Sequence, residues 1–108
     1  MQPIKYFVNL VSLNLSNSGI SRVEGLNDLN YLKELRLCEN NIRYIHGLLH
    51  TPSIELLNFS NNCITRISGL HKLRNLRVLW LNENAITQLG GLEELSELTQ
   101  LWLSLIHI

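Results

Sequence analysis

The stretch that decides the fold is L-K-E-L-R-L-C-E-N-N-I-R-Y-I-H-G-L, residues 32–48, because its leucines, isoleucines and glycine recur along the chain at a step of 22. Three columns stay apolar in five copies: Leu10, Leu32, Ile54, Leu76 and Leu98; Leu13, Leu35, Leu57, Leu79 and Leu101; Leu15, Leu37, Phe59, Leu81 and Leu103. A glycine column follows the same step through Gly25, Gly47, Gly69 and Gly91. An ungapped repeat of this kind is typical of a solenoid, in which each unit forms one coil stacked on the next.

The repeat fixes the expected domain organisation. A chain of 108 residues is long enough for one small domain. We predict a single domain over residues 1–108, with a partial first coil 1–9, repeats 10–31, 32–53, 54–75 and 76–97, and a truncated repeat 98–108. Because the chain begins and ends inside a coil without polar caps, we expect it to be a fragment of a longer repeat protein.

Within each unit the sequence predicts a strand and then a return made of turns. The alternation in Leu79-Trp80-Leu81 has the period of two of a strand with one buried face. After the strand, apolar residues recur every third position, which favours 3₁₀-like turns over a long helix. At the ninth position stand Ser18, Asn40, Asn62 and Asn84. A buried asparagine there should satisfy backbone groups of neighbouring coils, and the shorter Ser18 should leave the first turn looser.

The pattern L-x-x-L-x-L-x-x-N resembles the leucine-rich repeat family, and the unit length is similar to that of its 22-residue subclass. The resemblance covers Leu10 to Leu103. It implies an α/β leucine-rich-repeat solenoid, with a curved parallel sheet on the concave face and 3₁₀ or short helical turns and loops on the convex face. The subclass includes the leucine-rich regulatory subunit of type-one protein phosphatase, axonemal dynein light chains and ciliary scaffold proteins, which implies a binding module and not an enzyme.

Function is expected at the positions that escape the repeat and point away from the leucine core. Position five drifts from polar to aromatic along the chain, ending in Trp80 and Trp102, which should lie side by side on adjacent strands. Tryptophan is enriched in interface hot spots. The alternative is that the two rings only cover the strands or pack on further C-terminal structure. The candidate partner-binding residues are Arg36, Glu39, Leu56, Asn58, Val78, Trp80, Asn82, Glu83 and Trp102.

Charges follow the same step. Lys33, Glu55 and Arg77 share one column and Lys72 and Glu94 another, so we expect weak ion pairs between adjacent coils. Nine Lys plus Arg balance nine Asp plus Glu. This neutrality argues against nucleic acid as a partner. The sequence also lacks a long apolar run of about 18 residues, so no membrane span is predicted.

Catalytic and metal-binding patterns are weak. The one aspartate, Asp28, has no nucleophile and base beside it in the repeat, so no enzyme activity is expected. His46, His50 and His71 are conceivable metal ligands, but solvated histidines on the convex face are the better interpretation. We expect no cofactor, no metal and no small-molecule substrate. Cys38 and Cys63 occupy different repeat positions and are predicted to be free thiols.

The sequence therefore supports two functional hypotheses. The first is a protein–protein interaction module that binds a protein partner, such as a phosphatase, on its concave face and acts as a regulatory or scaffold subunit. The alternative is a structural component of an axonemal or cytoskeletal assembly that uses its convex and lateral surfaces, with ciliary or cytoskeletal partners. The start of the chain lacks the apolar core of a secretory signal. We expect a cytoplasmic protein, with the cilium and the nucleus as alternative locations.

Overall fold

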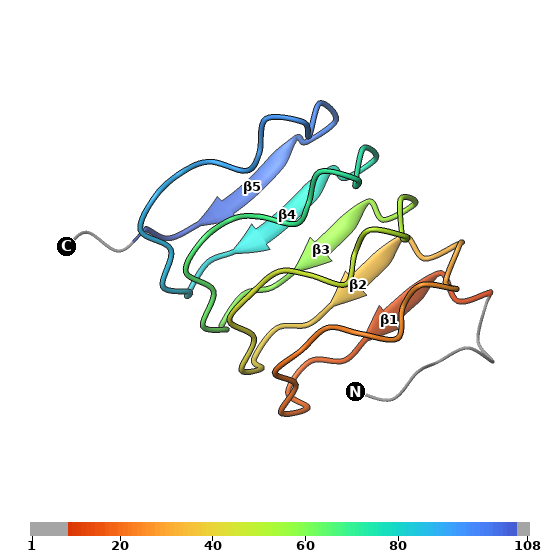
Figure 1. The fold of residues 1–108 in the computed structure, drawn as a ribbon, viewed down its shortest axis with the longest axis horizontal. Helices are drawn as coiled ribbons and strands as arrows, with labels where there is room; N and C mark the ends of the chain where they lie inside the picture. The colour runs from red at the N-terminus through yellow and green to blue at the C-terminus, as the bar shows by residue number, and fades with distance from the viewer. Residues whose placement is uncertain (1–8, 106–108) are drawn as a thin grey trace.

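The computed structural model describes residues 9–105, which form a single parallel sheet (Figure 1). The strands are β1 (Ser12–Asn14), β2 (Glu34–Arg36), β3 (Leu56–Asn58), β4 (Val78–Leu81) and β5 (Gln100–Leu103), and they lie side by side in chain order. Residues 1–8 and 106–108, which belong to the predicted partial first coil and to the tail of the truncated repeat, lie outside the described residues.

The register between strands equals the repeat of the sequence. Leu35 in β2 is paired with Leu13 in β1 and with Leu57 in β3, so every strand residue faces the residue one unit away. Each coil therefore places the same repeat position at the same height, and the predicted parallel solenoid is confirmed.

The core is a stack of leucine columns on one side of the sheet. The middle residues of β2 and β3 are fully buried while their neighbours are half-buried, as a period of two requires. Phe59 takes a leucine position and is also fully buried. Leu101 in β5 is 39% exposed, whereas Leu79 in the same column is at 0%. An inner coil is thus covered on both sides, and Leu101 has a described neighbour on one side only.

The return from one strand to the next consists of single turns. Leu73 donates its backbone N–H to the carbonyl of Leu70 at 2.9 Å, and Leu76 donates to Leu73 at 3.1 Å. These i to i−3 bonds are spaced three residues apart and do not run on consecutively, so they build no 3₁₀ helix. The 3₁₀-like turns expected on the convex side are therefore present as isolated turns. Residues 9–105 contain no helix, and so none that could cross a membrane.

An asparagine joins each of the second, third and fourth coils to the coil before it. Asn40 Oδ1 accepts hydrogen bonds from the backbone N–H groups of Ser18 and Ile20, each at 3.0 Å. Its Nδ2 donates to the carbonyl oxygens of Leu15, at 3.1 Å, and Leu37, at 3.0 Å. One amide thus satisfies backbone groups on two coils, as the sequence predicts.

The same arrangement recurs at Asn62 and Asn84. Asn62 Nδ2 donates to the carbonyls of Leu37 and Phe59, and Asn84 Nδ2 donates to Phe59 at 3.0 Å. The hydroxyl of Ser18, in the first coil, donates to the nearby carbonyl of Ser16 at 3.1 Å, so it does not link two coils as the asparagine amides do. The asparagine column is therefore continuous from the second coil to the fourth.

Replacing Asn40 with aspartate tests this column, because Asn40→Asp keeps the shape and the acceptor but removes the donors. A carboxylate oxygen would then face backbone carbonyls in a buried position. We expect the free energy of unfolding at neutral pH to fall by about 3 kcal/mol. Chemical denaturation measures it. The matched control is Asn41→Asp, an exposed neighbour, which should change stability by less than about 0.5 kcal/mol; equal losses in the two variants would contradict the role of the amide.

The glycine column lets the coils approach closely. Gly69 has φ +72°, and a Cβ built on it would collide with the backbone carbonyl oxygen of Ile45 on the preceding coil. Gly47 and Gly91 meet the preceding coil in the same way. The glycine is therefore required for stacking as well as for its backbone conformation.

A pair of alanine substitutions separates these two effects. Gly19 also has a positive φ, +69°, but nothing lies within 4 Å of a Cβ built there. Gly19→Ala should cost about 1 kcal/mol for the left-handed conformation alone. Gly69→Ala should lose a further amount of about 1–3 kcal/mol because the two coils must move apart. Thermal unfolding of the two variants gives the comparison, and similar melting temperatures would refute the steric explanation.

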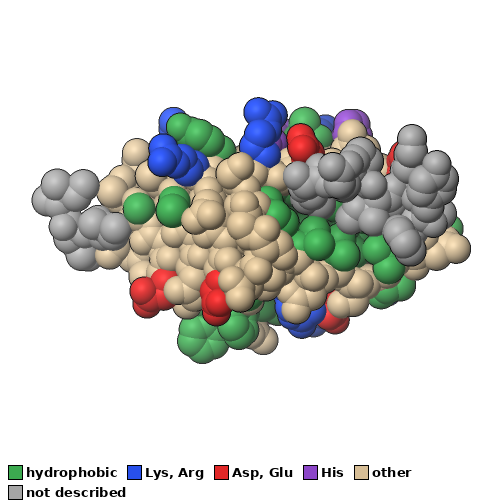
Figure 2. All heavy atoms as spheres, turned by 90° about the horizontal axis from the view of Figure 1, so that it is seen from below, with side chains coloured by type: hydrophobic (Ala, Val, Ile, Leu, Met, Phe, Trp, Pro, Cys, Tyr) green, Lys and Arg blue, Asp and Glu red, His purple; other side chains and the backbone are tan. Residues whose placement is uncertain are grey.

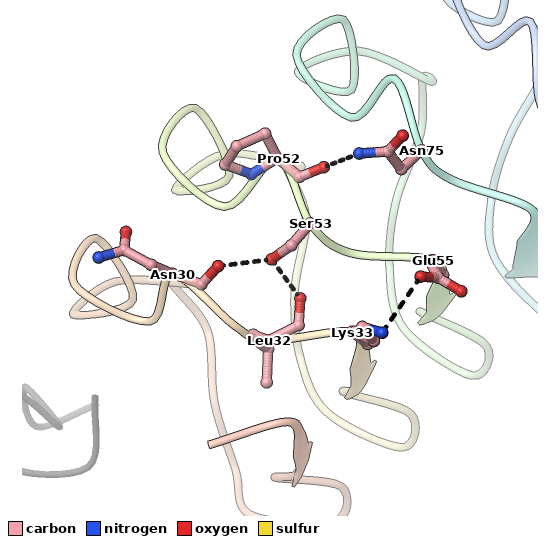
Figure 3. Close-up of polar contacts among 7 residues, drawn as sticks. All are labelled: Asn30, Leu32, Lys33, Pro52, Ser53, Glu55 and Asn75. Carbon is pink, nitrogen blue, oxygen red and sulfur yellow. Dashed lines mark hydrogen bonds and ion pairs between the residues drawn. The ribbon is translucent and has the colours of Figure 1, made fainter. Parts of the chain in front are cut away.

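Side chains in the segments that lead into the strands also link neighbouring coils (Figure 3). Ser53 Oγ donates to the carbonyl oxygens of Asn30 at 3.1 Å and Leu32 at 2.7 Å. Lys33 Nζ lies 3.9 Å from Glu55 Oε2, so this predicted pair is confirmed. These contacts join adjacent coils outside the core.

The other predicted ion pairs are wrong. Glu94 pairs with Arg74 at 3.6 Å and not with Lys72, and within residues 9–105 Glu55 has no ion pair with Arg77. Both members of the Arg74–Glu94 pair are more than half exposed. Exposed ion pairs are weak, so a shared column does not by itself select the partner.

Candidate functional site

Six of the nine candidate partner-binding residues lie on the outer sheet face, which we define as repeat positions three and five of β1 to β5, on the side of the sheet opposite the leucine core. Cross-strand pairing aligns them in two rows: Ser12, Glu34, Leu56, Val78 and Gln100 in one, and Asn14, Arg36, Asn58, Trp80 and Trp102 in the other. The side chains of a row are therefore direct neighbours.

The first half of the outer sheet face is polar and internally paired. Arg36 Nη1 lies 2.9 Å from Glu34 Oε1 on the same strand, so the two charges compensate each other. Ser12 Oγ donates to the same carboxylate at 3.5 Å. Asn58 Oδ1 accepts from the backbone N–H of Ser60 at 2.9 Å and from its hydroxyl at 2.6 Å. These groups are largely satisfied within the chain.

The second half of the face is apolar. The Trp80 and Trp102 rings have centroids 5.9 Å apart with a tilt of 53°, which confirms that they lie side by side. Trp80 is 38% exposed and Trp102 55% exposed. Leu56 and Val78 are paired next to them and are half-buried. A tilted ring pair within this distance is mutually stabilising, and its outer surface remains in contact with water.

The remaining candidates surround this apolar half at the ends of the strands. Glu39 and Glu83 are exposed and have φ of 56° and 57°. Asn82 is half-buried, and its Oδ1 is buried without a hydrogen-bond donor among the described residues. In Figure 2, charged and hydrophobic side chains are interspersed on the face seen from below, and hydrophobic atoms project from its lower edge.

The positive φ at repeat position eight is a feature that the sequence analysis missed. It occurs at Asn17, Glu39, Asn61 and Glu83. Asparagine at two of these four positions was the available signal, because asparagine tolerates the left-handed region better than most residues. The backbone N–H of Glu39 donates to Ser60 at 3.0 Å and that of Asn61 to Asn82 at 3.0 Å, so the conformation serves coil stacking.

A hollow on the lateral surface was also not predicted as a site. It has a volume of about 440 Å³ and lies among the loops of the first two coils. Its lining is Ser21, Arg22, Asn41, Arg43, Tyr44 and His46. The sequence carries no signal for it, because single residues on loops have no periodic pattern.

Histidines and cysteines show no convergent chemistry. Within the part of the chain that is described, no three His, Cys, Asp or Glu side chains are grouped so as to hold a metal ion. Both cysteines are free: Cys38 is half-buried with Sγ 3.0 Å from Ser16 Oγ, and Cys63 is exposed. The thiol state agrees with the prediction.

The geometry defines a parallel solenoid with a mixed polar and aromatic sheet face, and the comparisons with known proteins agree with it. Residues 52–94 match the family model described as leucine rich repeats (2 copies). None of the curated protein sequences matches the chain.

Three solved structures of internalins from Listeria monocytogenes are similar. Internalin F matches with a TM-score of 0.81 and 32% identity over 91% of this chain. The functional domain of InlJ, described as including a cysteine ladder, matches with a TM-score of 0.77 and 25% identity over 94% of this chain. Internalin C2 gives 0.58 and 29% identity over 84%. This chain spans 29%, 22% and 50% of those chains, respectively.

The chain thus has the fold of the leucine-rich repeat solenoids it resembles, and the family match covers residues 52–94 of it. Its two cysteines stand at different repeat positions, Cys38 at the seventh and Cys63 at the tenth, so they do not stack on one another. In this respect it differs from the description of InlJ.

Exchange of residues at position eight tests the strained backbone beside the candidate site. Glu39→Asn should raise the free energy of unfolding by about 0.5–1 kcal/mol, because asparagine adopts a φ of 56° at lower cost than glutamate. Asn61→Glu, the reciprocal change one coil later, should lower it by a similar amount. Urea denaturation of both variants decides the matter: shifts of the same sign would rule out the backbone explanation.

Proposed function

We propose that the outer sheet face binds a protein partner and that Trp80 and Trp102 form the centre of this contact. The observation that carries the proposal is the tilted ring pair, which is well packed internally yet 38% and 55% exposed. Large aromatic side chains left in water on a rigid sheet are characteristic of binding surfaces, because their apolar area is stabilised when a partner covers it.

The chemistry around the rings supports a protein partner over other ligands. Leu56 and Val78 extend the apolar area, while Arg36, already paired with Glu34, and the exposed Glu39 and Glu83 form a polar border. An apolar centre with a polar border is the usual composition of a protein–protein interface. The balance of nine basic and nine acidic residues gives no reason to expect a polyanion such as nucleic acid.

Within this proposal we favour a regulatory or scaffold subunit in the cytoplasm. This refinement rests on the resemblance to the 22-residue subclass, with its phosphatase subunit and its ciliary proteins. The second candidate is a structural component of an axonemal or cytoskeletal assembly, for which the lateral surface matters as much as the sheet. The cilium and the nucleus are the alternative locations. The lateral residues Arg43, Tyr44 and Arg66 are exposed and could carry such contacts.

Paired substitutions on the two surfaces separate these candidates. The immobilised protein captures partners from a cell extract, which mass spectrometry identifies, and the affinity for each purified partner is then measured. Trp80→Ala and Trp102→Ala should each weaken binding at least tenfold, since central tryptophans commonly contribute more than about 1 kcal/mol. The matched controls are Arg43→Ala and Arg66→Ala, each of which should leave the affinity unchanged.

Unfolding curves for all four variants are the check that the fold is retained. Unaltered capture by both tryptophan variants would refute the sheet-face proposal. Loss of capture in the arginine variants alone would favour the lateral, structural candidate instead.

A further inference from the structure

The lateral hollow between the first two coils has the size of a ligand site. Its volume of about 440 Å³ far exceeds the roughly 15 Å³ that a single water needs. It lies away from the strands, among the loops that follow β1 and β2. The backbone N–H of Asn41 donates to the carbonyl of Ile20 at 2.9 Å, which holds the two loops together at its base.

The repeat itself assembles the lining. The step of 22 places Arg43 beside Ser21 and Tyr44 beside Arg22, so the two arginines come from adjacent coils and lie in neighbouring columns. Ser21, Asn41 and Tyr44 add a hydroxyl, an amide and a phenol. Every one of these side chains can donate a hydrogen bond.

The hollow carries two arginines that have no acidic partner in the described part of the chain. Neither Arg22 nor Arg43 forms an ion pair with any of residues 9–105, and no carboxylate belongs to the lining. Arg36, by contrast, is paired with Glu34 at 2.9 Å. Two guanidinium groups at one hollow without an acidic partner repel each other, and an anion between them would remove this repulsion.

The sixth lining residue adds an unsatisfied group. His46 Nε2 is buried and has no hydrogen-bond partner among the described residues. Glu24, which occupies the same repeat position one coil earlier, is not part of the lining. Buried polar atoms without partners are uncommon and often mark a functional position.

We propose that this hollow binds a phosphate group, with Arg22 and Arg43 as the principal ligands and Ser21, Asn41 and Tyr44 as additional donors. Arginine presents a planar set of N–H donors that matches the oxygens of phosphate. The shared chemistry is a tetrahedral oxyanion, supplied either as free phosphate or as a phosphorylated side chain of a peptide. This site is separate from the outer sheet face and does not depend on its function.

The test uses the full chain labelled with ¹⁵N and titrated with inorganic phosphate at constant ionic strength. Saturable shifts are expected for the Arg22 and Arg43 side-chain N–H signals and the Tyr44 amide, with a Kd of about 1 mM. Arg22→Gln and Arg43→Gln should each weaken binding about tenfold. The matched control is Arg66→Gln: Arg66 lies one coil beyond Tyr44 in the same column and lines a different, smaller hollow, so this change should leave the Kd as it is.

A second arm identifies the source of the phosphate. A short serine peptide is titrated in phosphorylated and unphosphorylated form. Binding of the phosphopeptide at least tenfold tighter than that of inorganic phosphate assigns the site to phosphorylated chains, and equal affinity assigns it to free phosphate. Shifts that rise linearly without saturation, or that are the same in Arg22→Gln and Arg43→Gln as in the unaltered protein, would overturn the proposal.

Discussion

The structure depends on the side-chain amide that each of the second, third and fourth coils shares with the coil before it. A strand of three or four residues that turns back sharply leaves backbone N–H and C=O groups facing inward, and each would be costly if unpaired. Asn40, Asn62 and Asn84 pair these groups by accepting with Oδ1 and donating with Nδ2. Without that column the leucines would have no regular backbone on which to stack.

Stacking at a fixed step explains why the fold could be predicted from the sequence. The residues at positions one, four and six had to be apolar because they form one continuous core, and the glycine column was required because the preceding carbonyl stands where a Cβ would lie. The return was predicted less well. Apolar residues every third position are compatible with a 3₁₀ helix and also with separate turns, and the sequence does not distinguish the two.

A candidate site could be predicted only as far as it follows from the 22-residue period. Trp80 and Trp102 share a column, so their contact at 5.9 Å followed from the period alone. The partner of Glu94 did not, because long exposed side chains choose between neighbours at little energetic difference. The lateral hollow was beyond sequence reasoning, since it depends on the shape of two loops whose side chains differ from coil to coil.

The outer sheet face and the lateral hollow both result from the stacking of coils, but the contacts that stacking creates are favourable in the first and unfavourable in the second. A solenoid places like positions next to one another, so it tends to pair like side chains. On the sheet this brings two tryptophans into contact, which is favourable and leaves a shared apolar surface. In the loops, stacking brings Arg22 and Arg43, from neighbouring columns of adjacent coils, to one hollow, where like charges are unfavourable until an anion lies between them. The first surface is stable without a partner, whereas the second has an electrostatic cost that only a ligand or counterion removes. An anion bound in the hollow would therefore stabilise the first two coils, whereas a partner bound to Trp80 and Trp102 would contact the last two.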